Sequence, residues 1–387
     1  MTWQNIFSSG KSLESIALAM LRDTGLFEYG DCIAKHWPDF GQNGKEDIKI
    51  SDVCQHRSGL ANFAEAPSIK DAWPENIKKD QMSSLIEKLK PYYPLLEKHG
   101  SKCEYHAITR GWITNEIIRR VDPKHRTMDE IFKEEVNIDG IHITVDEKAA
   151  KKMVSQTFTS PGFVIGQSMI PKWAGRKIEP NLFSFIRFMG EFISLQEDYK
   201  DYKIIEFVAA FSAMQSRGQP KWPAFAKEFE GKNFHSDLGD YSLSDDLLKS
   251  ETASAFVKGN GRGCAKLASI LAHKGEGLMS EKAWNEMHSE PRKELMGEMP
   301  NGKIRVNFTQ GGVNKFIKFE DETEADKSLH ENRYGYYGWI GYGGSIVQWH
   351  PELKIGFAFL PTLLNTTEMF NERGAVLQQL VVDCTKK

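Results

Sequence analysis

Ser8-Ser9-Gly10-Lys11 is the stretch from which the fold is predicted, because it stands at the head of the first helical pattern in the chain. Between residues 11 and 24, apolar side chains recur with helical spacing, which predicts an amphipathic helix. The apolar stripe consists of Leu13, Ile16, Ala17, Met20 and Leu21. Ser8 or Ser9 can cap the start of this helix, and Gly25 can end it in a left-handed conformation.

Ser8 and Lys11 have the spacing of a nucleophile and its base. Positions i and i+3 lie on one face of a helix, so the Lys11 amine can reach the Ser8 oxygen. A serine hydroxyl needs such a neighbouring base to act as a nucleophile. The helix N-terminus also favours developing negative charge and helps to lower the pKa of the lysine. These residues are therefore a candidate catalytic pair.

Two other interpretations of the same residues stay open at this point. In one, Ser8 only caps the helix and Lys11 faces solvent. In the other, Gly10-Lys11-Ser12 ends a phosphate-binding loop of the form GxxxxGK[ST]. That loop needs a preceding strand and a first glycine, and Asn5 stands at the position of this glycine.

Further along the chain, the sequence predicts a mixture of helices and late strands. Helices are expected at residues 80 to 98, 107 to 120, 262 to 274 and 371 to 383. Strands are expected at 345 to 349 and 355 to 360, and turns at Pro161-Gly162 and Gly218-Gln219-Pro220. Helices at both ends of the sequence around late strands fit an α/β layer with a helical lobe. No role is assigned to residues 123 to 250.

Composition excludes several classes of function. The formal net charge of -3 gives no basic surplus for a nucleic-acid surface. The five cysteines form no CxxC pair, and the histidines show no ligand spacing, so we expect neither metal nor organic cofactor. The N-terminus does not look like a signal peptide, and no apolar run is long enough to cross a bilayer. We expect a cytoplasmic protein, although a targeting segment could precede Met1; the sequence gives no oligomeric state.

Several segments together resemble the β-lactamase-related serine hydrolase family, which includes class C β-lactamases, penicillin-binding carboxypeptidases and family VIII carboxylesterases. The segment His56-Arg57-Ser58-Gly59-Leu60 is similar to the family's HTSGL element, at the expected distance from Ser8. Residues 25 to 31 and 36 to 40 are similar to the family's segment after the nucleophile helix, and residues 260 to 271 are similar to its later helix. The resemblance runs almost end to end.

The resemblance implies an α/β (α+β) fold of the β-lactamase/transpeptidase type, in which helices flank an antiparallel central sheet beside a helical lobe. Residues 1-387 would form a single module. Its α/β lobe would take approximately residues 1-30 and 255-387, and its mainly helical lobe approximately 31-254. Relatives carry a helix and the first strands of the sheet ahead of the nucleophile, so we expect the sheet of this chain to lack those strands.

The resemblance also assigns roles around Ser8 and Lys11. Tyr105-His106-Ala107 matches the family's Y-x-N motif, so Tyr105 would share the role of base with Lys11, and Ala107 replaces the amide of the motif. A tyrosinate would need a nearby cation, which Lys11 could supply.

Trp339-Ile340-Gly341 matches the third motif in its W-x-G form, whose glycine lets a strand approach the substrate closely. The N–H groups of Tyr342 and Ser8 would then form the oxyanion hole.

The third motif bears on the substrate. β-Lactamases and carboxypeptidases of this family hold a substrate carboxylate with a lysine at the position of Trp339. Tryptophan offers an apolar face instead, which predicts a small neutral ester or amide as substrate rather than penicillin. The alternative is a catalytically weak or inactive relative that uses the same fold as a scaffold or binding module.

Overall fold

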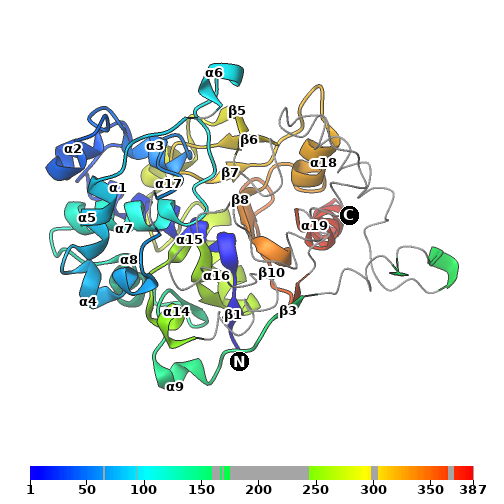
Figure 1. Cartoon of the computed structure of the whole chain (residues 1–387). Helices are drawn as coiled ribbons and strands as arrows, with labels where there is room; N and C mark the ends of the chain where they lie inside the picture. The colour runs from blue at the N-terminus through cyan, green and yellow to red at the C-terminus, as the bar shows by residue number, and fades with distance from the viewer. Residues whose placement is uncertain are drawn as a thin grey trace.

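The computed structural model describes residues 1–63, 66–93, 95–158, 166–167, 170–174, 244–297, 304–364 and 370–386 (Figure 1). Strands and helices alternate irregularly along them. The strands are β1 Gln4–Asn5, β2 Ile141–His142, β3 Thr157–Phe158, β4 Lys258–Gly259, β5 Arg292–Met296, β6 Ile304–Phe308, β7 Asn314–Lys315, β8 Tyr337–Ile340, β9 Ile346–His350, β10 Ile355–Phe359 and β11 Leu363–Leu364. The predicted turns at 161–162 and 218–220 lie outside the described residues.

The main sheet, within the described part of the chain, has six antiparallel strands in the order β10-β9-β8-β7-β6-β5. Both predicted strands near the C-terminus are confirmed as β9 and β10, which pair as a hairpin from Ile346↔Phe359 to His350↔Ile355. A smaller sheet has the order β1-β4-β2 and pairs Gln4 with Gly259. The second small sheet is the parallel pair β11-β3.

The helices gather mainly on one side of the main sheet, where α1 to α5, α7 and α8 are drawn in Figure 1. Their bounds are α1 Lys11–Asp23, α2 Ile33–His36, α3 Ile50–Cys54, α4 Pro74–Ile77, α5 Gln81–Glu87, α6 Leu96–His99, α7 Thr109–Val121, α8 Met128–Ile131, α9 Glu147–Ala150, α14 Asp245–Lys249, α15 Ala253–Phe256, α16 Gly261–Ala272, α17 Glu281–His288, α18 Glu324–His330 and α19 Glu372–Thr385. The helices predicted at 11–24, 107–120, 262–274 and 371–383 are confirmed as α1, α7, α16 and α19.

The single helix predicted at 80–98 is wrong. The structure has α5, which ends at Glu87, and a separate short helix α6 from Leu96. Pro91 stands between them, and a proline disfavours helical dihedral angles at the residue before it. The apolar periodicity of this segment extends beyond Pro91, but the helix itself cannot, so periodicity alone predicted too long a helix.

Helix α1 is more deeply buried than its amphipathic pattern predicted. Every residue from Lys11 to Arg22 is buried, including the polar ones between the apolar stripe positions. The helix is capped by Gly10 without a side-chain hydrogen bond, so the predicted serine cap is wrong. The predicted end is correct, because Gly25 has a φ of +78°.

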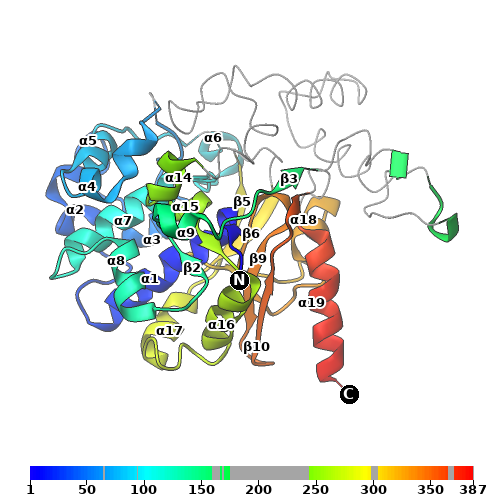
Figure 2. The same cartoon turned by 90° about the horizontal axis from the view of Figure 1, so that it is seen from below.

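The main sheet is covered on both faces, with α16 on one side and α19 on the other (Figure 2). Two glycines permit this close packing. A Cβ on Gly356 of β10 would lie 2.2 Å from the Ser269 nitrogen in α16, and a Cβ on Gly374 of α19 would lie 2.3 Å from the Ile346 side chain in β9. The helix–sheet contacts thus depend on backbone that carries no side chain.

No helix in the described ranges has the length and apolar character needed to cross a membrane. The division into an α/β lobe and a helical lobe stays a prediction, as does the cytoplasmic location.

We predict that Gly356→Ala destabilises the protein by about 1 to 3 kcal/mol, because the added methyl group must push α16 away from β10. Urea unfolding of the whole chain measures the loss. Gly30→Ala is the matched control, since a Cβ there meets nothing within 4 Å. Equal unfolding midpoints for the two variants would contradict the prediction.

Candidate active site

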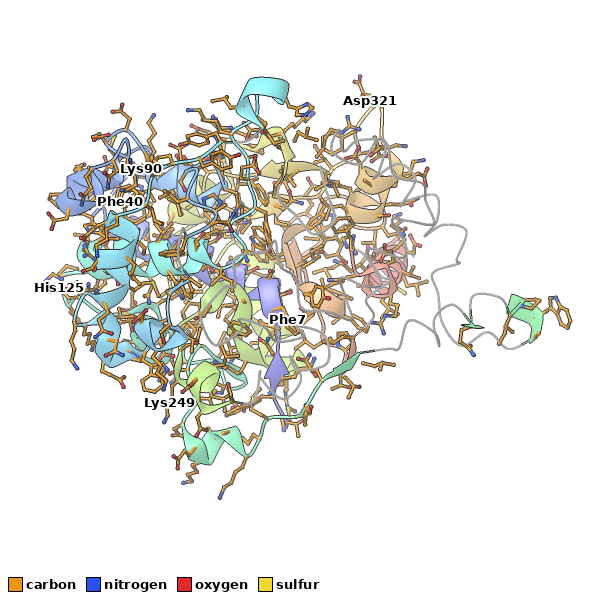
Figure 3. All side chains as sticks on the ribbon, viewed as in Figure 1. Phe7, Phe40, Lys90, His125, Lys249 and Asp321 are labelled. Atoms are coloured by element: carbon orange, nitrogen blue, oxygen red, sulfur yellow. The ribbon has the colours of Figure 1, made fainter. Side chains whose placement is uncertain are left out.

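The turn that carries Ser8 is a 3₁₀ helix, Phe7–Gly10, which leads directly into α1. Phe7 has a φ of +47°, in the left-handed region that non-glycine residues rarely adopt. Phe7, labelled in Figure 3, is buried, as are Ser9 and Gly10, whereas Ser8 is partly exposed. Strained backbone of this kind clusters at functional sites, and here it immediately precedes the one residue of the turn that reaches the surface.

The Lys11 amine lies inside the protein beside Ser8. Its Nζ is 3.2 Å from Ser8 Oγ, and it donates hydrogen bonds to the Ala107 carbonyl at 2.7 Å and the Ser254 carbonyl at 2.9 Å. Lys11 is completely buried. The predicted contact between Ser8 and Lys11 is present, and the alternative of a solvent-facing lysine is wrong.

Burial also changes the protonation of this amine. It lowers the pKa of Lys11 to about 7, because an ammonium ion loses its hydration there. The Glu14 carboxylate opposes this shift, and the Arg110 guanidinium adds to it. At neutral pH a substantial fraction of Lys11 is therefore an uncharged amine.

Tyr105 completes a cluster of three polar groups. Its hydroxyl lies 2.6 Å from Ser8 Oγ, and Lys11 Nζ lies 4.9 Å from the centre of its ring. Burial raises the pKa of Tyr105 to about 12, with the hydrogen bond to Ser8 acting in the opposite direction. The side chain is thus a neutral phenol at neutral pH, and the Lys11 amine lies beside its ring, as predicted from the sequence.

Ala107 takes part through its backbone. From the sequence, Ala107 was expected to mean the loss of a side-chain amide that orients lysine or substrate. In the structure the Ala107 carbonyl accepts a hydrogen bond from Lys11, so the main chain of this segment orients the amine.

The end of β8 lies against the Ser8 turn. A Cβ on Gly341 would lie 2.4 Å from the Ile6 carbonyl oxygen, so a larger residue would separate the two segments. Ser345 stabilises the same contact, because its hydroxyl donates a hydrogen bond to the Ile6 carbonyl at 2.6 Å. The Tyr342 ring meets the Phe7 ring edge-on at 6.0 Å. Gly341 and Tyr342 are therefore brought to Ser8; the oxyanion role of the two N–H groups stays a prediction.

Trp339 lies behind the cluster rather than over an open pocket. Only 5% of its surface is exposed, and its ring stacks on Phe308 at 5.1 Å. Its indole N–H donates to the Gly312 carbonyl at 2.8 Å, and Lys11 Nζ lies 5.6 Å from the ring centre. The apolar face of Trp339, which was expected to contact the substrate, thus packs mostly against other residues of the protein.

His56 belongs to the HTSGL-like segment, but no role for its side chain was predicted from the sequence. His56 has a φ of +60°, and its Nδ1 accepts the backbone N–H of His106 at 2.9 Å. Because His106 directly follows Tyr105, this bond fixes the backbone beside the phenol. Burial keeps the pKa of His56 well below its usual value, so the ring is neutral. The unusual backbone angle is not visible in a sequence.

Glu14, Arg110 and Ser254 were also missed. Glu14 and Arg110 form an ion pair in which both side chains are fully buried, and Ser254 contacts both Lys11 and Glu14. A glutamate one helical turn after Lys11 was the available signal. Among the described residues, no group of three or more His, Cys, Asp or Glu side chains is arranged to hold a metal ion.

Comparisons with known proteins agree with this geometry. The sequence model of the Beta-lactamase family matches residues 2–381. A curated relative, the esterase/beta-lactamase LipL of Mycobacterium tuberculosis, is 29% identical over 142 residues. That match covers 36% of this chain and 30% of LipL.

Two solved structures share the fold, and each match covers 99% of this chain and 84% of the other chain. One is a family VIII carboxylesterase, with a TM-score of 0.67 and 20% sequence identity. The other is a penicillin-binding protein homologue from Caulobacter crescentus, with a TM-score of 0.65 and 18% sequence identity. The predicted β-lactamase/transpeptidase-like fold is confirmed.

Proposed function

Since this chain belongs to the beta-lactamase family, we propose that it is a serine hydrolase that cleaves a small neutral ester or amide through an acyl-enzyme on Ser8. The proposal rests on the close contact of three side chains, Ser8, Lys11 and Tyr105. Ser8 Oγ lies within hydrogen-bond distance of both the Tyr105 hydroxyl and the buried Lys11 amine. The names of LipL and of the family VIII carboxylesterase point to the same reaction class.

The hydrogen bonds of Lys11 explain how it would act as the base. In the uncharged amine, two N–H groups serve the carbonyls of Ala107 and Ser254. The nitrogen lone pair is then left to face Ser8 Oγ and accept its proton. The Ser8 oxygen bonds to the carbonyl carbon of the substrate, and the π electron pair moves onto the carbonyl oxygen.

Collapse of the tetrahedral intermediate would break the bond to the leaving group. The departing oxygen or nitrogen takes the proton of the Tyr105 hydroxyl, and the proton held by Lys11 restores the phenol. Water then attacks the acyl-enzyme by the same route, which releases the acid and returns Ser8 to its starting state. The N–H groups of Ser8 and Tyr342 are proposed to hold the oxyanion in both steps.

Charge supports a neutral substrate. Trp339 stands where the family's β-lactamases carry a lysine for the substrate carboxylate. Lys11 and Arg110 are both fully buried, and Arg110 is paired with Glu14, so neither cation is presented to a carboxylate at the surface.

We predict that Ser8→Ala abolishes both labelling by a fluorescent fluorophosphonate and hydrolysis of p-nitrophenyl butyrate, with turnover reduced by at least about a thousandfold. Ser12→Ala is the matched control, because Ser12 lies in the first turn of α1, close to Ser8 in the chain, and its buried hydroxyl has no partner among the described residues. Labelling that persists in Ser8→Ala would assign the reaction to another residue. A folded wild type that neither labels nor turns over the ester would favour the binding scaffold.

We predict that kcat/KM for the ester rises with pH and levels off with a midpoint of about 7, because Lys11 must lose its proton before it can accept that of Ser8. Below the midpoint, the rate should fall about tenfold per pH unit. Fluorescence and circular dichroism across the same pH range control for unfolding. A rate that does not change between pH 5 and 9 would exclude Lys11 as the base.

We predict that nitrocefin, which carries a carboxylate, is hydrolysed with a kcat/KM at least about a hundredfold below that of p-nitrophenyl butyrate. The physical reason is that the charged group finds no exposed cation at the position of Trp339. Comparable rates for the two compounds would refute a preference for neutral substrates and leave the serine mechanism intact.

A further inference from the structure

A buried ion pair lies directly beneath the candidate active site. Glu14 of α1 and Arg110 of α7 are both fully buried, and the Arg110 Nε lies 3.1 Å from Glu14 Oε2. These two atoms form an ion pair without a hydrogen bond between them, so their contact is mainly electrostatic. Burying two charges costs several kcal/mol of desolvation, and apolar residues often stabilise a fold equally well. The stability of the fold alone therefore does not explain why an ion pair is buried at this place.

Ser254 connects the carboxylate to the catalytic lysine. The Ser254 carbonyl accepts a hydrogen bond from Lys11, and its hydroxyl donates to Glu14 Oε1 at 2.5 Å. The same hydroxyl accepts the backbone N–H of Gly111 at 2.9 Å. Any movement of Glu14 would thus move one of the two carbonyls that hold the Lys11 amine.

Gly312 connects the guanidinium to the third motif. Arg110 Nη1 donates to the Gly312 carbonyl at 3.1 Å, and the Trp339 indole N–H donates to the same oxygen. The guanidinium carbon also lies 5.1 Å from the centre of the Trp339 ring. Gly312 has a φ of +84°, and a Cβ there would lie 2.6 Å from Arg110 Nη2, so this approach requires glycine.

We propose that the buried Glu14–Arg110 ion pair is a positioning unit of the candidate active site. Its carboxylate fixes the Lys11 amine through Ser254, and its guanidinium fixes the indole of Trp339 through Gly312. Its two charges act on Lys11 in opposite directions, so the pair keeps the amine in the protonation state the reaction needs. This inference rests on the proposed function, because it gives Lys11 the role of base.

The charges that face Lys11 come from several elements. Glu14 lies on its own helix and Arg110 on α7. Tyr105, His56 and His106 lie nearby, but burial keeps all three neutral near pH 7: it raises the pKa of Tyr105 to about 12, lowers that of His106 to about 4, and keeps that of His56 well below its usual value. Burial also raises the pKa of Glu14, and the neighbouring Arg110 opposes this shift. Glu14 and Arg110 are therefore the charges that can be changed to test the inference.

The test compares the pH dependence of ester hydrolysis in three variants. Glu14→Gln leaves Arg110 unbalanced, which disfavours protonated Lys11, so the midpoint of the kcat/KM profile should move down by about one pH unit. Arg110→Met removes the guanidinium that disfavours protonated Lys11, so the midpoint should move up by about one pH unit. The double variant should return to within a few tenths of a pH unit of the wild type, because the two effects cancel.

Two further variants separate this role from a purely structural one. Arg22→Met removes ion pairs with Glu28 and Glu286 near the other end of α1, and should leave the midpoint unchanged. Arg110→Lys keeps the positive charge but not the forked contacts to Gly312 and Ser15, so its midpoint should stay near the wild-type value while kcat falls. If Arg110→Met does not fold, Arg110→Gln takes its place, because it also removes the positive charge and keeps a polar side chain.

Midpoints that stay fixed, or that move in the same direction in Glu14→Gln and Arg110→Met, would overturn the proposal. The titration of Lys11 is also followed directly by NMR of protein carrying ¹³C-labelled lysine, with Lys11→Met to assign the signal. If the wild type proves inactive, the proposed function fails, and the NMR midpoints alone decide whether the pair controls Lys11. Opposite shifts there support the inference, and equal midpoints reject it.

Discussion

The burial of the Lys11 amine between two carbonyl groups is the constraint on which the site depends. Ala107 and Ser254 are far apart in the sequence, yet both accept hydrogen bonds from the same nitrogen. These carbonyls accept hydrogen bonds from two N–H groups of the amine, so the remaining bonding position on the nitrogen faces Ser8. Because the amine is fully buried, its charged form is disfavoured and its pKa falls to about 7. One packing arrangement thus sets the position, the direction and the protonation of this group.

The fold supplies this arrangement by bringing four segments to one place. Helix α1 carries Lys11, the segment before α7 carries Tyr105 and Ala107, α15 carries Ser254, and the end of β8 packs against the Ser8 turn through Gly341. These contacts need very close backbone approach, and the main sheet needs the same where α16 lies on β10. The small residues at these contacts therefore matter as much as the polar groups they position.

The sequence predicted those parts of the site that follow from local spacing or from motifs. Ser8 and Lys11 lie one helical turn apart, so their contact was predictable from helix geometry. The partnership of Glu14 with Arg110 was not, because it joins two helices whose packing no local pattern defines. The same limit applies to α1, whose polar side was expected at the surface and is buried by tertiary contacts. In the segment 80–98, periodicity outweighed Pro91 in the prediction, and the structure follows the proline.

The distribution of charge connects the buried pair to the choice of substrate. Glu14 and Arg110 neutralise one another, which leaves Lys11 as the group whose charge would change in the proposed transfer of the Ser8 proton. The Arg110 guanidinium lies over the Trp339 ring and is fully buried, so it contacts the indole and is not presented to a ligand. A lysine at position 339 would add a second positive charge beside Lys11 and would further disfavour its protonated form. Tryptophan at this position and a balanced ion pair beneath it are thus two parts of one electrostatic arrangement, which fits the proposed acyl group without a charge of its own.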